Sequence, residues 1–236
     1  MPDAVAMLLA DLARDAARLF VPVACAGCGL DDVPLCESCA ALWWEEPFLA
    51  HEWAGRLAVV GRSPMPVWAV NELEGPVHRA IATWKDGGRR DLDAVFAAAA
   101  GRAAATIAPA LSPVGPLMVV PLPSKPRSVR RRGADLTRVL GHSVGRALGA
   151  PCVRALEAIG GESRGSSSKG RWASAEVRVT RLPGPGTALL VDDVMSTGAT
   201  LARAADALEA VSVPVIGALV LAASPRRDVG SRRGLG

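Results

Sequence analysis

One stretch, residues 188–211, constrains the fold more than any other part of the chain. Its first four residues, Ala-Leu-Leu-Val, form a continuous apolar run that is typical of a buried parallel strand. A short hydroxyl-rich loop follows, and apolar residues at helical spacing predict a helix over 201–211. A strand, a loop and a helix in this order form an anion site, because the N–H groups of the loop and first helical turn face the ligand and the helix dipole favours negative charge.

The side chains of this stretch indicate which anion would bind. Asp192 and Asp193 directly follow the apolar run, and ionised carboxylates only accept hydrogen bonds, so the pair suits a vicinal diol. The loop adds hydroxyl donors, and Gly198 permits close approach of its backbone. A sugar diol beside a sugar phosphate is a ribose 5-phosphate. The expected phosphate-binding residues are Val194, Met195, Ser196, Thr197, Gly198, Ala199 and Thr200.

The acidic pair has two simpler interpretations. The pair could end a strand in an ordinary α/β protein. It could also belong to a Walker B strand, which requires Gly-x-x-x-x-Gly-Lys-Ser/Thr upstream. The nearest approach to that motif runs from Gly160 to Gly165 and lacks the lysine, so we set the Walker interpretation aside.

The whole stretch resembles the phosphoribosyl-pyrophosphate signature of type I phosphoribosyltransferases. The shared pattern is an apolar strand, Asp-Asp, two apolar residues, two small or hydroxylic residues, Gly, any residue and Thr. The resemblance implies an α/β fold with a parallel sheet flanked by helices. It also implies that the chain binds phosphoribosyl pyrophosphate with Mg²⁺ and that Asp192 and Asp193 are its catalytic residues.

Length and composition set broad limits on the protein. Its 236 residues, half of them hydrophobic, suffice for one large domain with a small module. A net charge of +4 permits a polyanionic partner without requiring one. No apolar run is long enough to span a membrane, and residues 1–20 predict an amphipathic helix and not a signal peptide. We therefore expect a cytoplasmic protein with reduced cysteines.

Four of the five cysteines form two closely spaced Cys-x-x-Cys pairs, at Cys25 and Cys28 and at Cys36 and Cys39. In a reduced compartment this spacing predicts one tetrahedral zinc site with four thiolate ligands and no open position, which makes the zinc structural. A redox pair and a site without metal are the alternatives. We expect the remaining Cys152 to act as a small buried hydrophobe.

The rest of the chain alternates predicted strands and helices. We expect strands at 67–70, 117–120, 153–156, 176–180, 187–191 and 213–221. We expect helices at 75–85, 91–108, 133–148 and 201–211.

A Pro-rich basic segment follows the strand predicted at 117–120. A pyrophosphate requires backbone donors and fixed positive charge, and Lys125 and Arg127 could supply the charge. The phosphoribosyltransferase resemblance implies that this strand end forms the pyrophosphate loop. A solvated basic loop and a nucleic-acid-binding patch are the alternatives.

Residues 157–175 are rich in Gly and Ser and carry Arg164, Lys169 and Arg171. This composition predicts a mobile loop between strands. Basic residues on such a loop could form a lid or the acceptor side of an anion site. A plain connection without a function is the equal alternative.

Several motifs along the chain occur in the order seen in the ComF family: the cysteine pairs, Lys85-Asp-Gly-Gly, Val120-Pro-Leu-Pro, Arg132-Gly and the acidic pair. This resemblance implies a phosphoribosyltransferase-like protein with an N-terminal zinc finger, linked in transformable bacteria to the uptake of single-stranded DNA. Together with the residue patterns, it divides the chain into an amphipathic helix at 1–20, a zinc module at 21–47 and a phosphoribosyltransferase-like domain at 48–223. The resemblance does not cover residues 224–236, whose composition predicts a disordered basic tail. Residues 134–136 are Ala-Asp-Leu where the family usually has Phe-Asn-Gln, so the acceptor side differs.

Three functions follow from these patterns. The leading hypothesis is a Mg²⁺-dependent transfer, present or ancestral, of a 5-phosphoribosyl group with release of pyrophosphate. The first alternative is a regulatory protein of DNA uptake that binds single-stranded DNA or uptake proteins and uses the sugar-phosphate pocket as a ligand sensor. The second is a nucleobase-salvage phosphoribosyltransferase.

Overall fold

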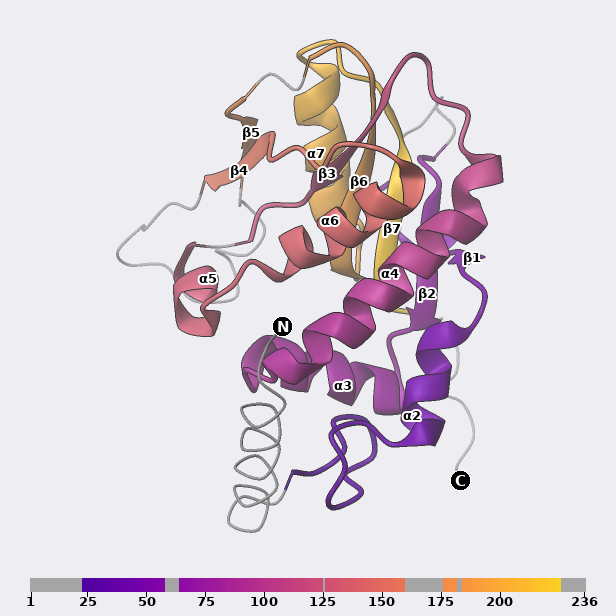
Figure 1. Cartoon of the computed structure of the whole chain (residues 1–236). Helices are drawn as coiled ribbons and strands as arrows, with labels where there is room; N and C mark the ends of the chain where they lie inside the picture. Colours follow the sequence, from indigo (N-terminus) through magenta and orange to yellow (C-terminus); the bar gives the residue numbers. More distant parts are fainter. Residues whose placement is uncertain (1–22, 58–63, 125, 160–175, 182–183, 226–236) are drawn as a thin grey trace, which may run out of the picture.

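The centre of the molecule is a five-stranded sheet in the order β1-β2-β7-β6-β3 (Figure 1). The four strands from β2 to β3 are parallel, and the short β1 is antiparallel to β2. The strands are β1 Phe48–Leu49, β2 Val67–Glu72, β3 Leu117–Pro121, β6 Thr187–Met195 and β7 Val215–Ala223. A second sheet pairs β4 Leu156–Ile159 with β5 Glu176–Val179 in antiparallel register. The predicted α/β class with a mostly parallel sheet is confirmed.

This computed structural model describes residues 23–57, 64–124, 126–159, 176–181 and 184–225. The helix expected at 1–20, nearly all of the expected tail, Lys125 and the candidate lid residues Arg164, Lys169 and Arg171 lie outside these ranges. Within them, no helix is both long enough and apolar enough to cross a membrane.

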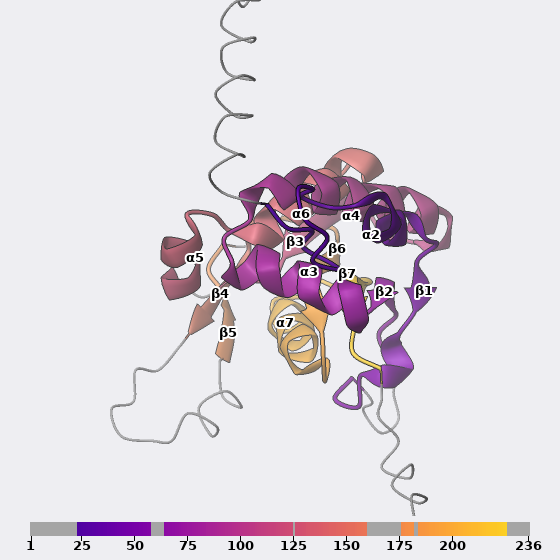
Figure 2. The same cartoon turned by 90° about the horizontal axis from the view of Figure 1, so that it is seen from below.

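Helices cover both faces of the main sheet. Alternate residues of a strand point to opposite faces, and β6 follows this rule: Leu189 and Val191 join one apolar core, whereas Ala188 and Leu190 join the other. The first core contains α3 Gly75–Asp86, α4 Asp93–Ile107 and α6 Leu136–Leu148, and the second contains α7 Ala199–Glu209. Figure 2 shows α4 and α6 on the side of the sheet opposite α7.

The N-terminal cysteine segment packs against the helical layer through aromatic side chains. It continues into α2 Glu37–Ala41 and a single 3₁₀ turn, Leu42–Trp44. Trp43 is buried and stands edge-on to Phe96 of α4, with ring centroids 4.5 Å apart. Phe96 makes a similar contact with Trp84 of α3 at 4.7 Å. The three rings join the cysteine segment, α3 and α4 into one apolar unit.

Two sequence-based predictions of local structure need correction. The basic segment after β3 is not a loop throughout, because Pro126–Arg132 forms the helix α5. Proline is favoured in the first turn of a helix, and Gly133, at φ 72°, ends this one. The strand expected at 153–156 begins only at Leu156, because Val153 instead donates its N–H to the carbonyl of Val119, at the edge of β3.

Candidate functional site

The acidic pair lies at the carboxyl edge of the parallel sheet. Strand β6 continues through both aspartates to Met195, so the carboxylates are held by the strand and not by the loop. The neighbouring β3 ends beside them, where the Leu122 N–H donates to the Val191 carbonyl at 2.8 Å. Helix α3 crosses below this edge (Figure 1). Ligands of open α/β sheets bind at this edge, outside the carboxyl ends of the strands.

Asp193 forms an ion pair with Lys85, the penultimate residue of α3. The Lys85 Nζ lies 2.8 Å from Oδ1 and 2.8 Å from Oδ2 of Asp193, whose side chain is 10 % exposed. Sequence reasoning assigned no role to Lys85, although its Lys-Asp-Gly-Gly motif was noted. A lysine followed by two glycines at a helix end was the available signal, but only the fold brings it to the acidic pair.

Asp192 has a different environment from its neighbour. Its Oδ1 accepts the Asp193 N–H at 2.8 Å. Desolvation by burial raises the pKa of the Asp192 carboxyl well above its usual range, the charge of Asp193 raises it further, and Lys85 opposes the rise. A bound cation or the donors of a diol would favour the charged form of this carboxyl. Asp192 is therefore the carboxyl of the pair that is left open to a ligand.

The loop at 196–198, predicted to bind a phosphate, joins the acidic pair to the N-terminus of α7. Ser196, Thr197 and Thr200 are exposed. Gly198 caps the helix at φ 76°, a left-handed conformation that favours glycine. A Cβ at this position would lie 2.7 Å from the Ala54 Cβ and 2.9 Å from the Leu57 Cγ, so neighbouring side chains also disfavour larger residues. The hydroxyl groups and the start of an 11-residue helix lie directly after Asp192 and Asp193.

The segment after β3 is fixed by a small hydrogen-bond network. The Ser124 hydroxyl donates to Asp135 Oδ1 at 2.9 Å, and Thr137 Oγ1 lies 2.9 Å from the same oxygen. The backbone of Arg127 lies in α5, and an ion pair between Arg131 and Asp86 at 2.6 Å joins α5 to the end of α3. The segment expected to bind pyrophosphate therefore adjoins the helix that carries Lys85.

The four N-terminal cysteines form a second candidate site, suited to a metal. Their Sγ atoms all lie within 4.8 Å of one another, and Cys28 and Cys36 are 3.6 Å apart. Zn–S bonds of about 2.3 Å in a tetrahedron place sulfurs about 3.8 Å apart, so the cluster fits zinc. Burial raises the pKa of Cys25, but N–H donors from Cys36, Cys28 and Gly27 outweigh this and lower it to about 6, which favours the thiolate.

Two arginines connect the cysteine cluster to the rest of the molecule. Arg79 of α3 donates from Nε to the Gly27 carbonyl at 2.5 Å. Arg89 donates to the carbonyls of Ala24 and Pro34 at 3.1 and 3.2 Å, and its charge is balanced by Asp91. The knuckle that holds the sulfurs is thus bonded to α3, the helix that carries Lys85.

Cys152 is not fully buried, contrary to the expectation of a small core hydrophobe. It lies beside the edge of β3, where its backbone forms an isolated parallel β-bridge with Val119, and it lines a cavity. Desolvation raises the pKa of its thiol, so the thiolate fraction at neutral pH is small and the sulfur reacts slowly.

Comparison with known proteins supports the interpretation of the carboxyl edge. A family model described as "Phosphoribosyl transferase domain" matches residues 145–233, which include β6, the acidic pair and α7. Among curated proteins, none matches the sequence significantly.

The solved structures that are similar to the chain include two adenine phosphoribosyltransferases. One, an adenine phosphoribosyltransferase, is 14% identical, covers 78% of this chain and 88% of its own, and has a TM-score of 0.34. The other, adenine phosphoribosyltransferase from Leishmania donovani, is 11% identical, covers 84% of this chain and 87% of its own, and has a TM-score of 0.35. The family match falls on the strand, loop and helix that form the site, and the chain is phosphoribosyltransferase-like in this region.

Proposed function

We propose that this protein binds phosphoribosyl pyrophosphate with Mg²⁺ and transfers, or descends from proteins that transferred, its 5-phosphoribosyl group. One observation carries the proposal: two carboxylates at the end of β6 directly precede a hydroxyl-lined loop and the start of α7. In this proposal the 5-phosphate binds at 196–200, and the ribose hydroxyls donate to Asp192 and Asp193. The pyrophosphate binds near Lys125 and Arg127.

The chemistry would depend mainly on positioning and charge. The bond between the anomeric carbon and the pyrophosphate oxygen breaks, its electron pair leaves with the pyrophosphate, and the ribose ring becomes oxocarbenium-like. A carboxylate close to the ring stabilises this positive charge, and the phosphate loop fixes the sugar against the acceptor. Lys85 holds the Asp193 carboxylate in place through both of its oxygens.

The donor set at this edge fits Mg²⁺. The ion prefers oxygen ligands and is commonly held by one or two carboxylates together with substrate phosphates, and Asp192 and Asp193 are the carboxylates available here. When bound, Mg²⁺ would neutralise charge on the departing pyrophosphate. The fit of the four cysteines to zinc likewise supports a structural Zn²⁺ at Cys25, Cys28, Cys36 and Cys39.

Finer parts of the proposal come from the sequence patterns and the ComF resemblance. The patterns suggest the division at residues 20, 47 and 223 and a lid or acceptor side formed by Arg164, Lys169 and Arg171. The resemblance suggests a link to DNA uptake. The proposal also assigns the protein to the cytoplasm, where thiols stay reduced and available to zinc.

Calorimetric titration of the zinc-loaded protein with phosphoribosyl pyrophosphate and Mg²⁺ tests the proposed function. We expect binding by the wild type and none by the double variant Asp192→Asn/Asp193→Asn, provided that circular dichroism shows both proteins folded. Equal binding by the two proteins would show that the ligand binds elsewhere. Once binding is established, a panel of nucleobases as acceptors tests the salvage alternative.

One observation favours a second candidate function, the binding of single-stranded DNA. Helix α5 carries three consecutive arginines at 130–132, and Arg130 and Arg131 are exposed. A binding role predicts that oligonucleotide affinity falls steeply with salt and that changing Arg130 to Arg132 to Ala removes most of this dependence. Affinity that is unchanged in that variant would exclude α5 as the contact.

A further inference from the structure

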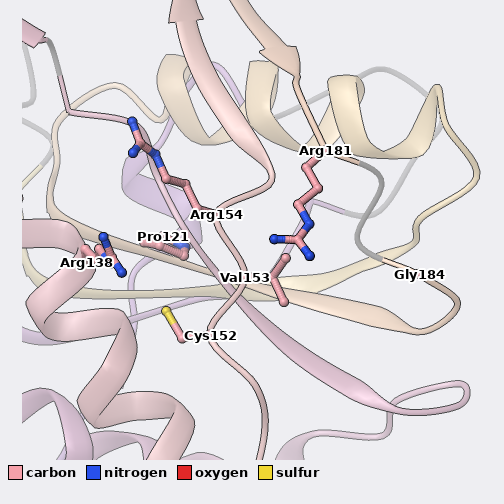
Figure 3. Close-up of a pocket in the computed structure, with 7 residues that line it drawn as sticks. All are labelled: Pro121, Arg138, Cys152, Val153, Arg154, Arg181 and Gly184. Carbon is pink, nitrogen blue, oxygen red and sulfur yellow. The ribbon is translucent and has the colours of Figure 1, made fainter.

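A cavity of about 490 Å³ lies at the outer edge of β3, apart from the acidic pair (Figure 3). Figure 3 shows three arginines among its lining residues, each from a different segment: one from α6, one from the connection to β4 and one from the connection to β6. The described residues that line it are Pro121, Arg138, Cys152, Val153, Arg154, Arg181 and Gly184. A volume of this size is typical of sites for small molecules.

The charge of the cavity wall is positive and not compensated within the wall. No described lining residue is acidic, and neither Arg154 nor Arg181 forms an ion pair with another described residue. A smaller pocket beside the cavity shares Arg138 and Arg154 with it and contains two carboxylates, which have other partners. Glu157 forms an ion pair with Arg178 at 3.1 Å, and Asp135 accepts a hydrogen bond from the Ser124 hydroxyl. Like charges that line one cavity without a counterion repel one another, and a bound anion would relieve this repulsion.

The backbone around the cavity is closely packed. Helix α6 approaches the segment at 150–152 through Gly141 and Gly145, where an added Cβ would lie 3.0 Å from the Cys152 sulfur and 2.6 Å from the Ala150 oxygen. The Val153 N–H donates to the Val119 carbonyl at 2.8 Å, which fixes the same segment to β3. The wall of the cavity formed by α6 and the segment at 150–153 is therefore built on fixed elements.

We propose that this cavity is a second anion site, which binds a chain of phosphate groups such as that of a nucleoside triphosphate. Guanidinium groups bind phosphate oxygens with paired N–H donors, and three of them match a ligand with several phosphates. The site is independent of the proposed function, but Pro121 of its wall pairs with Val191, the residue before Asp192. An anion bound here would adjoin the strand that holds the acidic pair.

Cys152 offers a local probe for the test, because it lines the cavity and is the one cysteine outside the four-cysteine cluster. In zinc-loaded protein we expect inorganic tripolyphosphate to slow alkylation of Cys152 by iodoacetamide, and calorimetry to detect its binding. In the variant Arg154→Gln/Arg181→Gln, protection is lost and binding weakens by at least about tenfold. The matched control Arg146→Gln changes an exposed arginine of α6 that does not line the cavity, and it keeps both effects.

Several results would overturn the proposal. The proposal fails if tripolyphosphate leaves the rate of Cys152 alkylation unchanged. It also fails if tripolyphosphate still protects Cys152 in the double arginine variant. Single-stranded oligonucleotide that protects Cys152 when tripolyphosphate does not would assign the arginines to nucleic acid instead. Binding of phosphoribosyl pyrophosphate is measured separately, and we expect only the Asp192/Asp193 variant to lose it. The proposed function and the second anion site can therefore be disproved independently.

Discussion

Asp192 and Asp193 are adjacent in sequence but have opposite electrostatic environments. Asp193 has a full ion-pair partner in Lys85, whereas Asp192 is partly buried next to the negative charge of Asp193. The folded structure therefore stabilises the charge of one carboxylate and opposes the charge of the other. This asymmetry can be measured without any ligand.

We predict that Asp192→Asn raises the free energy of unfolding at pH 7, whereas Asp193→Asn lowers it by about 1–3 kcal/mol, the usual loss for a hydrogen bond to a charged group. Asparagine at 192 keeps the acceptor for the Asp193 N–H but removes an opposed charge. Urea denaturation in Mg²⁺-free buffer measures both effects.

The pH dependence supplies a control for the Asp192 interpretation. A carboxyl whose folded pKa is raised binds more protons when folded, so wild-type stability falls as pH rises from the unfolded pKa through the folded one. The advantage of Asp192→Asn should shrink as pH falls through this range and vanish below the ordinary carboxyl pKa. An advantage that does not vary with pH would mean that the gain is not electrostatic.

At the residue scale, sequence reasoning predicted one site from the acidic pair and the hydroxyl-rich loop, but it did not include Lys85. The pair and loop are contiguous, so their spacing alone predicts a shared site. Lys85 comes 108 residues before Asp193, and only the path of α3 across the sheet edge brings the two together. Contacts of this kind depend on tertiary structure and leave no local pattern.

Helix α7 owes its position to the turn at Gly198. This residue combines a left-handed backbone with contact against Ala54 and Leu57, from the segment that precedes β2. The Arg56 N–H also donates to the Thr197 carbonyl at 3.1 Å. The loop that would hold a phosphate is thus supported from behind by another part of the chain.

We predict that Gly198→Ala destabilises the protein more than Gly149→Ala does. Gly149 caps α6 at φ 62° with open space around it, so its replacement costs only the left-handed backbone, about 1–2 kcal/mol. Gly198→Ala adds the clash with Ala54, a further ~1–3 kcal/mol. Thermal unfolding of the two variants gives the comparison. Equal losses of stability would show that the segment around Ala54 moves to accommodate the added methyl group.

Elements with one dominant pattern were predicted well from the sequence, and mixed segments were not. The apolar strands β3, β6 and β7 and the amphipathic α6 and α7 lie near their expected positions. Helix α5 was missed because Pro and Arg indicated a loop, although a proline in the first turn is compatible with a helix. The β4 strand was placed three residues early because the bonds of Val153 to β3 are not visible in sequence.

At the scale of the whole molecule, the cysteine cluster and the acidic pair are linked through α3. One end of the link is Arg79 on the Gly27 carbonyl, and the other is Lys85 on Asp193. Trp84 lies between them in the aromatic cluster with Phe96. A metal that orders the cysteine knuckles therefore also restrains the helix that supplies the lysine.

We predict that removing zinc loosens α3 and weakens binding of phosphoribosyl pyrophosphate by at least about fivefold, within the usual range of coupling between sites. Hydrogen exchange should become faster in α3 and stay unchanged in α7. Cys152→Ser is the matched control, since it removes a cysteine outside the cluster and should retain one zinc per chain. Unchanged exchange in α3 after chelation would show that its packing suffices without the metal.

The order of strands in the main sheet has a consequence for how the chain is made. Val67 of β2 pairs with a strand about 150 residues further on, and β3 reaches the rest of the sheet only through β6. A ribosome adding about 5–20 residues per second needs roughly 8–30 s to supply the missing partner. Throughout that interval the edge of β2 that will pair with β7 has no partner strand. The newly made chain must therefore be kept from aggregating with other chains until its own last strand emerges.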